Sequence, residues 1–301
     1  MMSKHFSGAI GLLVLATLLW SGNYIAGRYL ASVMPAFFLN GLRWLFSALL
    51  FSLVARAKKV PIPLRQEAPL LLMLGLLGMF FFSSLTYLGL RSVPAAQAGM
   101  ISGLIPISIL LFSAVLLGER PTGSGWVGVL LAVLGVGILM SGQMSHLAVP
   151  SIGDWELIGA ALSWGAYTAL GRRYRTRMSA LSMTAGAAIY GAVPSLIVGL
   201  ISLRGATLHF TPVAWLALVY VGTAASVLAY WSWNQGVMIL GAARSAPFIN
   251  LLPVFTVILG ILLLHESVSG QEMVGGAVTL IGAFLSGLQS LPVPVTTKSA
   301  R

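Results

Sequence analysis

Long apolar runs follow one another along the whole chain, separated by short stretches that carry charge, proline or glycine. Each run has about twenty residues, which is the length that one helix needs to cross a bilayer. The recurrence predicts an all-α integral membrane protein with ten transmembrane helices. We place these spans near residues 8–30, 35–55, 68–90, 95–117, 123–141, 154–172, 179–203, 212–236, 242–264 and 271–290. Hydrophobic residues make up 58% of the chain and charged residues 8%, a balance unsuited to a soluble core.

The positive charge falls mostly on one side of the predicted bundle. The chain has 17 Lys and Arg against 6 Asp and Glu. When loops alternate between two sides, the clusters RAKKVPIPLRQE and GRRYRTR share one side with both termini, whereas Arg28, Arg91 and Arg204 fall on the other. Because cytoplasmic loops are enriched in Lys and Arg, we predict that both termini are cytoplasmic. We interpret the clusters as topological anchors and expect no nucleic acid as a partner.

The chain repeats itself at a shift of 147 residues. The segment GLRSVPAAQAGMISGLIPISILLFSAVLLGERPTGSGWVG, which starts at Gly89, resembles the segment that starts at Gly236. Identical residues pair in order at this shift: Gly89 with Gly236, Ala95 with Ala242, Pro106 with Pro253, Glu119 with Glu266, Gly128 with Gly275 and Gly135 with Gly282. The first spans match at a shift of 144, which pairs Trp20 with Trp164. The pattern predicts a repeated unit of five helices.

Five spans in each unit is an odd number, so the second unit enters the membrane from the opposite face. This predicts two inverted five-helix repeats around a central cavity, an arrangement suited to alternating access. We place the first repeat at residues 1–149, the second at residues 150–290 and a cytoplasmic tail at residues 291–301.

Both halves have a Trp in the first helix, a Pro in the middle of the fourth and a Glu at its end: Trp20, Pro106 and Glu119, then Trp164, Pro253 and Glu266. Over nearly the whole chain this pattern resembles the EamA-type branch of the drug/metabolite transporter superfamily. Within that branch the chain looks most like the YddG-type aromatic amino-acid exporters. The resemblance implies a basket of ten helices that exports amino acids and related small metabolites through a bacterial inner membrane.

Polar and aromatic side chains line one face of several predicted spans. In the first span, Trp20, Asn23, Tyr24 and Gly27 have the i, i+3, i+4 and i+7 spacing of one helix face. A polar side chain in hydrocarbon costs roughly 1–3 kcal/mol unless it faces protein or water, so such faces point inward. We predict that the following residues line the substrate cavity: Trp20, Asn23, Tyr24, Arg43, Phe80, Ser84, Tyr87, Trp164, Tyr167, Tyr230, Asn234 and Asn250. The alternative for each is a hydrogen-bonded contact between packed helices.

Two arginines lie in or beside the first two spans. Arg28 is near the outer end of its span, where a long side chain is expected to reach the lipid headgroups. Arg43 lies about eight residues inside its span, roughly 12 Å deep at the helical rise, so we expect it to face protein. Two roles stay open for Arg43: a structural anchor bonded to backbone carbonyls, or a site for a substrate carboxylate.

Prolines and glutamates recur at matched positions of the two halves. Pro106 and Pro253 interrupt helical hydrogen bonds near the middle of their spans and predict bends with free carbonyls. Glu119 and Glu266 end their helices on opposite faces, which favours caps or contacts between the repeats over proton carriage. We assign these four residues structural or gating roles. Ser269 and Glu272 have capping-box spacing at the start of the last helix.

All acidic residues fall in loops or at span ends, and no histidine lies at a span centre. Proton-coupled pumps normally place a titratable group at membrane depth. We therefore expect a neutral or zwitterionic solute to cross without proton coupling through a buried carboxylate. Aromatic faces and carbonyls would hold its ammonium, and hydroxyls, amides or Arg43 its carboxylate.

Several other classes of protein fit the sequence poorly. The chain has no cysteine, and no histidine pairs with an intramembrane acid, so we predict no enzyme, no metal site and no cofactor. The inverted repeat disfavours a channel or receptor. The alternative within carriers is export of another metabolite or drug class, such as a nucleoside- or sugar-type solute. The expected partners are the small-molecule substrate and the lipid bilayer.

Overall fold

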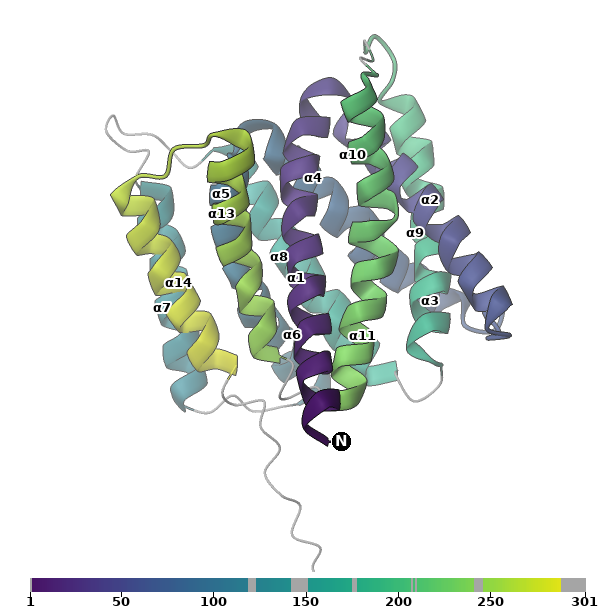
Figure 1. The fold of residues 1–301 in the computed structure, drawn as a ribbon, viewed down its shortest axis with the longest axis horizontal. Helices are drawn as coiled ribbons and strands as arrows, with labels where there is room; N and C mark the ends of the chain where they lie inside the picture. The colour runs from purple at the N-terminus through teal and green to yellow at the C-terminus, as the bar shows by residue number, and fades with distance from the viewer. Residues whose placement is uncertain are drawn as a thin grey trace, which may run out of the picture.

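Ten helical rods stand side by side in the computed structural model (Figure 1). The structure describes residues 2–118, 123–141, 151–174, 178–206, 208, 210–240 and 246–287. The rods of the first repeat are α1 (Met2–Val33), α2 (Ala36–Ala57), α3–η1–α4 (Ala68–Leu74, Gly75–Phe81, Phe82–Ser92), α5–η2–α6 (Ala95–Ile101, Ser102–Leu104, Ile105–Leu117) and α7 (Gly123–Ser141). Those of the second are α8 (Ile152–Tyr174), α9 (Ala180–Ile201), α10–η5–α11 (Pro212–Gly222, Ala224–Leu228, Ala229–Leu240), η6–α13 (Ala246–Asn250, Leu251–Leu264) and α14 (Gly270–Gly287). The predicted all-α architecture of ten helices in two repeats is confirmed.

Most of these rods have the length and composition of membrane spans. Among the described residues, six helices are long and apolar enough to cross a membrane: Ser7–Val33, Ala36–Ala57, Ala68–Ser92, Ala95–Leu117, Ala180–Ile201 and Pro212–Gly236. Three shorter apolar helices accompany them: Gly123–Leu139, Phe248–Leu264 and Gly270–Leu285. The tenth rod is α8, which carries Asp154, Glu156 and Arg173 near its two ends. Large apolar side chains such as Leu53, Leu130 and Leu216 are exposed on the outside of the bundle, as a lipid-facing surface requires.

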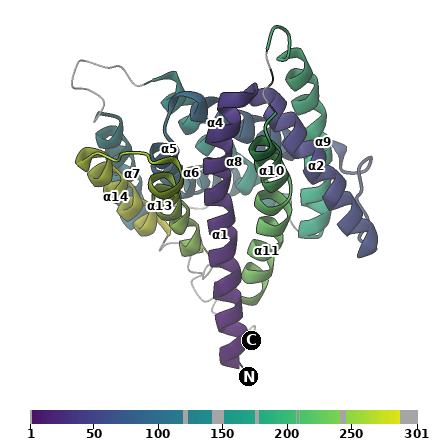
Figure 2. The ribbon, with the colours of Figure 1, turned by 45° about the horizontal axis from the view of Figure 1, so that its top comes forward.

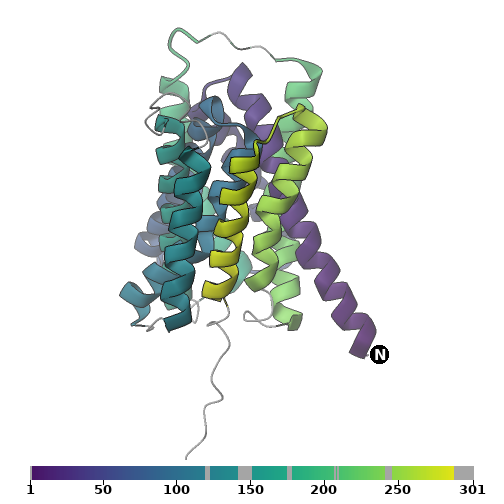
Figure 3. The same ribbon diagram turned by 90° about the vertical axis from the view of Figure 1, so that its left-hand side faces the viewer.

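The chain begins and ends its helical part at the same end of the bundle. Figures 1 and 3 show the start of α1 and the end of α14 at this end, which we call the N-terminal end. The opposite end, called the distal end, carries the short connections after Val33, Ser92 and Leu264. Ten crossings return the chain to the end where it started. Because each repeat contributes five of them, an odd number, the second repeat runs upside down relative to the first.

Equivalent rods of the two repeats pack in equivalent ways. The first span, α1, packs on α10 and α11 of the other repeat, and its counterpart α8 packs on α4. Figures 1 and 2 show α1 near the middle of the molecule, with the α5 and α13 rods on one side and α10 and α11 on the other. The pair α2 and α9 lies at one edge and the pair α7 and α14 at the other.

Small residues allow the backbones of α7 and α14 to touch (Figure 3). A Cβ atom added to Gly135 would lie 2.4 Å from Thr279 N, and one added to Gly282 would lie 2.4 Å from Ala132 N. One added to Gly275 would lie 2.5 Å from Leu139 N. No side chain fits at such distances, so glycine is required for this close approach.

Irregular helical turns also occupy matched positions. The π-helical segments η1 and η5 interrupt the third and eighth spans, and their last residues, Phe81 and Leu228, are 147 positions apart. A 3₁₀ turn precedes Pro106 in the fourth span and another precedes Pro253 in the ninth. The carbonyl of Leu252, beside the second of these breaks, accepts a hydrogen bond from Ser21 Oγ of α1 at 3.0 Å.

Candidate functional site

Aromatic rings from both repeats meet in the middle of the bundle. Tyr230 of α11 makes edge contacts with Trp20 of α1 at a centroid distance of 5.5 Å and with Trp164 of α8 at 6.2 Å. Trp233 lies 5.5 Å from Trp20, and Tyr167 lies 5.1 Å from Trp164. We call these five residues the aromatic cluster. The two tryptophans are the repeat-matched pair, so Tyr230 bridges equivalent first helices of the two halves.

Four polar residues form a second group, which we call the polar layer: Asn23, Arg43, Tyr87 and Ser226. Arg43 Nη1 donates to the Tyr87 hydroxyl at 2.9 Å, and Arg43 Nε donates to Ser226 Oγ at 3.0 Å. The Tyr87 hydroxyl in turn donates to Asn23 Oδ1 at 3.0 Å. These bonds join α1, α2, α4 and η5, and they cross from the first repeat into the second.

The polar layer lies about one helical turn from the aromatic cluster. Asn23 follows Trp20 by three positions in α1, and Ser226 precedes Tyr230 by four, each a spacing of about 5 Å along a helix axis. Both groups therefore border the same region of the bundle, with the polar layer on its distal side. An aromatic surface with a guanidinium beside it suits a solute that has an apolar body and an anionic end.

Arg43 is a buried charge without an acidic partner. Its side chain is 4% exposed, and it forms no ion pair among the described residues. The guanidinium carbon lies 5.0 Å from the Trp44 ring and 5.7 Å from the Tyr87 ring, both within cation–π range. Its Nη2 has no hydrogen-bond partner in the part of the chain that the structure describes. The hydrogen bonds of Nη1 and Nε both go to side-chain oxygens and not to backbone carbonyls, and the choice between a structural anchor and a carboxylate site stays a prediction.

Other residues predicted to line the cavity lie in helix contacts. Ser84 accepts a hydrogen bond from Asn40 Nδ2 at 2.9 Å, and Asn40 also donates to Ser195 of α9. Phe80 stacks on Phe37 at a centroid distance of 6.2 Å, apart from the aromatic cluster. Ser84 and Phe80 thus make contacts between packed helices, and their roles as cavity residues stay predictions.

Three predicted residues have a less defined setting. Tyr24 is buried in the apolar core near Tyr87. Asn234 is half-buried in α11 and makes no hydrogen bond among the described residues. Asn250 ends the 3₁₀ turn η6, and its Oδ1 is buried without a partner in the described part of the chain. Their roles as cavity residues stay predictions.

Glu266 connects the two repeats at the distal end. Its Oε1 accepts a hydrogen bond from Ala95 N at 2.7 Å, and its Oε2 accepts one from Ala96 N at 2.8 Å. The carboxylate of the second repeat thus caps α5 of the first, a contact between the repeats as the sequence suggested. Glu119, its counterpart, lies outside the described residues. The predicted capping box of Ser269 and Glu272 is confirmed by hydrogen bonds of 2.7 and 3.2 Å.

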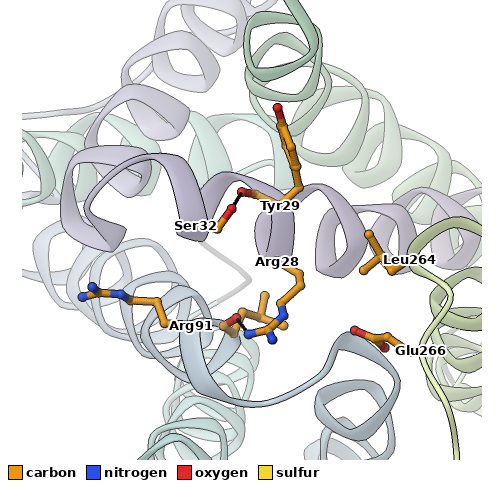
Figure 4. Close-up of a pocket in the computed structure, with 7 residues that line it drawn as sticks. Arg28, Tyr29, Ser32, Arg91, Leu264 and Glu266 are labelled. Carbon is orange, nitrogen blue, oxygen red and sulfur yellow. Dashed lines mark hydrogen bonds between the residues drawn. The ribbon is translucent and has the colours of Figure 1, made fainter. Parts of the chain in front are cut away.

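A cavity of about 370 Å³ opens at the distal rim, away from the aromatic cluster. Arg28, Tyr29 and Ser32 of α1, Arg91 of α4 and Glu266 contribute to its lining (Figure 4). The expectation that Arg28 reaches the headgroups is wrong, because its Nη1 turns inward and donates to the carbonyl of Leu90. The predicted central cavity stays a prediction.

Sequence analysis did not identify Ser226 as the partner of Arg43. The π-helical turn η5 changes the phase of the eighth span, and Ser226 Oγ donates to Val221 O, five residues earlier, at 2.7 Å. A regular period of 3.6 residues therefore misplaces side chains on one side of this turn. The glycines Gly75 and Gly222, 147 positions apart, were the available signal for the two irregular segments.

Comparisons with known proteins agree with the two-repeat architecture. The EamA-like transporter family model matches residues 7–141 and again residues 151–288. A solved crystal structure superposes with a TM-score of 0.69 at 25% sequence identity, covering 94% of this chain and 97% of the other.

Named relatives cover most of the chain at low identity. A probable amino-acid metabolite efflux pump of Escherichia coli (strain K12) is 26% identical and covers 93% of this chain and 94% of its own. A probable terminal-alkyne amino-acid exporter of Streptantibioticus cattleyicolor is 26% identical, with 95% coverage of each chain. An uncharacterized transporter of Bacillus subtilis (strain 168), YyaM, is 28% identical over 76% of each chain. Two family matches that span most of the sequence identify the chain as a member of the EamA-like transporter family, a multi-pass membrane transporter of the drug/metabolite transporter superfamily and not an enzyme.

Proposed function

We propose that this chain exports neutral amino acids, aromatic ones among them, and related small metabolites by alternating access. The observation that carries the proposal is Arg43, a buried guanidinium with an unpartnered Nη2 and no acidic neighbour among the described residues. A cation at membrane depth is costly unless a ligand or protein group pairs with it. A substrate carboxylate supplies that missing charge in the bound state.

The aromatic cluster supports the other half of the solute. Trp20, Trp164 and Tyr230 offer ring faces and edges one helical turn from Arg43, a setting for an apolar or flat side chain. A protonated amine is also attracted to such faces, so a zwitterion fits without a buried acid. Two of the named relatives are described as amino-acid efflux proteins, which favours this substrate class over nucleoside- or sugar-type solutes.

The remaining features concern orientation and energy coupling. The cytoplasm would adjoin the N-terminal end, where the basic clusters gather, and the distal end would face outward from a bacterial inner membrane. Asp154 is buried but lies at the start of α8, where Gln97 Nε2 donates to its Oδ1 at 2.8 Å. The described acids thus lie at span ends, which argues against proton coupling through a carboxylate at mid-membrane depth.

Counterflow uptake into proteoliposomes tests the substrate class. A panel of labelled Phe, Trp, Tyr, Met and Leu is compared with a nucleoside, a sugar and the amino-acid amides, which lack the carboxylate. We expect flux of the amino acids and about 100-fold less in Arg43→Gln, since a charge-assisted pair worth roughly 3 kcal/mol is lost. Arg56→Gln, which removes an exposed cation near the N-terminal end, is the matched control.

The outcomes separate the alternatives. Arg43→Lys keeps the charge and should recover part of the flux, provided that all variants remain monodisperse in detergent. Equal flux in wild type and Arg43→Gln, or faster exchange of the nucleoside or sugar, would contradict the proposal. Accumulation of solute against its gradient when a proton gradient is imposed would reject the uncoupled mechanism.

A further inference from the structure

Three charged side chains line the cavity at the distal rim, the cations Arg28 and Arg91 and the carboxylate of Glu266. Figure 4 shows Arg28 reaching in from α1 and Glu266 from the segment after α13, while Arg91 extends away from Arg28. No ion pair joins Arg28 to Glu266 among the described contacts. The volume, about 370 Å³, lies within the roughly 300–1,000 Å³ that small-molecule sites occupy.

Both charged groups are fixed and keep free bonding capacity. Arg28 donates one hydrogen bond, from Nη1 to Leu90 O, and its other guanidinium nitrogens have no partner among the described residues. Each oxygen of Glu266 accepts one backbone N–H, from Ala95 or Ala96, and a carboxylate oxygen has room for a second donor. The cavity therefore presents one set of donors and one set of acceptors in place beforehand.

The neutral polar groups of the cavity are already committed. The Tyr29 hydroxyl lies 2.9 Å from Thr211 Oγ1, and Ser32 Oγ donates to Tyr29 O at 2.7 Å. Leu264 adds an apolar wall. Arg91 also lines the cavity, but its side chain extends away from Arg28 (Figure 4). What faces a ligand between α1 and the segment after α13 is therefore the Arg28 guanidinium, the Glu266 carboxylate and an apolar patch, which together match a zwitterion with an apolar side chain better than a simple anion.

We propose that this rim cavity is a second solute site, in which Arg28 holds the carboxylate and Glu266 the ammonium of a neutral amino acid on its way out at the distal end. The assignment rests on the proposed export of amino acids. It is separate from the aromatic cluster, since the cavity is lined by other residues. Because the site opens toward one face only, a substitution in it should change the apparent affinity for solute supplied from that face and not for solute supplied from the other.

The experiment measures counterflow of a labelled neutral amino acid from each face, in right-side-out and inside-out membrane vesicles. We expect Arg28→Gln to raise the half-saturation concentration from the distal face about tenfold, because a charge-assisted hydrogen bond is lost. From the opposite face the value should stay within about twofold of wild type. Arg28→Lys, which keeps the charge, should recover most of the distal affinity.

Two further comparisons test the chemistry of the site. Arg204→Gln removes another exposed cation near the distal end, outside the cavity lining, and should leave both half-saturation values unchanged. The amide of the same amino acid, added unlabelled at the distal face, should compete much more weakly than the zwitterion in wild type. It should compete just as weakly in Arg28→Gln, because the amide has no carboxylate for Arg28 to bind.

The results distinguish the site from the export function. If Arg28→Gln changes the half-saturation concentration equally from both faces, or from neither, the rim site is overturned. Amino-acid flux in wild type would still support the proposed export. A purely structural role of Arg28, in tying α1 to α4, predicts a fall in thermal stability and equal losses from both faces. Absence of amino-acid flux in wild type overturns the proposed function, and the zwitterion assignment falls with it.

Discussion

The two repeats meet symmetrically at the α7–α14 edge and asymmetrically near the aromatic cluster. At the edge, the repeat-matched glycines Gly135 and Gly282 make the same backbone approach, each leaving 2.4 Å for an added Cβ. Near the centre, Tyr87 donates to Asn23 at 3.0 Å. Their counterparts Asn234 and Tyr167 share no hydrogen bond in the described part of the chain.

The helices that carry these side chains differ in the same way. In the first repeat the backbones of α1 and α4 pack against each other, whereas their counterparts α8 and α11 meet through the rings of Trp164 and Tyr230 and not through closely packed backbones in the described part of the chain. Such a difference between the two repeats is expected of an inverted-repeat carrier that is more closed toward one face than toward the other, because the two halves exchange conformations during transport. The two repeats therefore match at the α7–α14 edge and differ near the aromatic cluster.

The largest effect is expected from filling the symmetrical edge. Gly135→Leu places a side chain against the backbone of Thr279, so we expect a loss of more than about 3 kcal/mol and little folded protein. The measurement is the yield and thermal unfolding of the detergent-purified variant. Gly137→Leu is the control, because a Cβ at Gly137 has nothing within 4 Å. Similar yields for both variants would show that the edge is not a rigid contact.

A smaller effect should come from removing one hydroxyl at the centre. Tyr87→Phe deletes the acceptor for Arg43 and the donor to Asn23, which should weaken the contact of α4 with α1 and α2 by about 1–2 kcal/mol. Backbone amides of α4 should then exchange hydrogen about tenfold faster. Tyr167→Phe, the matched change in the second repeat, removes no hydrogen bond between described residues and should leave α8 unchanged. Equal acceleration in both variants would refute the asymmetry.

The smallest effect is expected where α14 begins. Ser269→Ala removes the oxygen that accepts from Glu272 N at 3.2 Å, at a cost of about 0.5–1 kcal/mol. The unfolding temperature should fall by a few degrees at most while the glycine contacts of the edge persist. Ser267→Ala, an exposed position without a described hydrogen bond, provides the baseline. A large loss would mean that the cap, and not the glycines, holds the edge together.

The lengths of the apolar runs and their repetition were enough to predict the ten-helix architecture. Each span is recognisable as an apolar run by itself, and the spans follow one another in the same order in both repeats. The matching of Gly135 with Gly282 indicated the repeat, but not that these glycines pack across to each other's helix. Side-chain partners were less predictable. Arg43 was expected to face protein, yet its bond to Ser226 depends on the π-helical turn η5, which a regular helical period does not represent.

The rim shows the same limit of sequence reasoning. Arg28 lies where lipid headgroups are expected, and no pattern within the first span shows that the Leu90 carbonyl is within reach of its side chain. Such contacts depend on how helices distant in sequence are placed side by side. Composition restricts which residues can be buried, but the partner of each is decided by tertiary packing.

The paired π-helical segments also bear on the ancestry of the molecule. Because η1 and η5 end at positions 147 residues apart, one in each half, the same local insertion is present in both copies. Two independent insertions at one matched place are a less economical history than a single one inherited by both. The insertion would then predate the gene duplication, and the ancestral five-helix protein would have inserted into the membrane in both orientations.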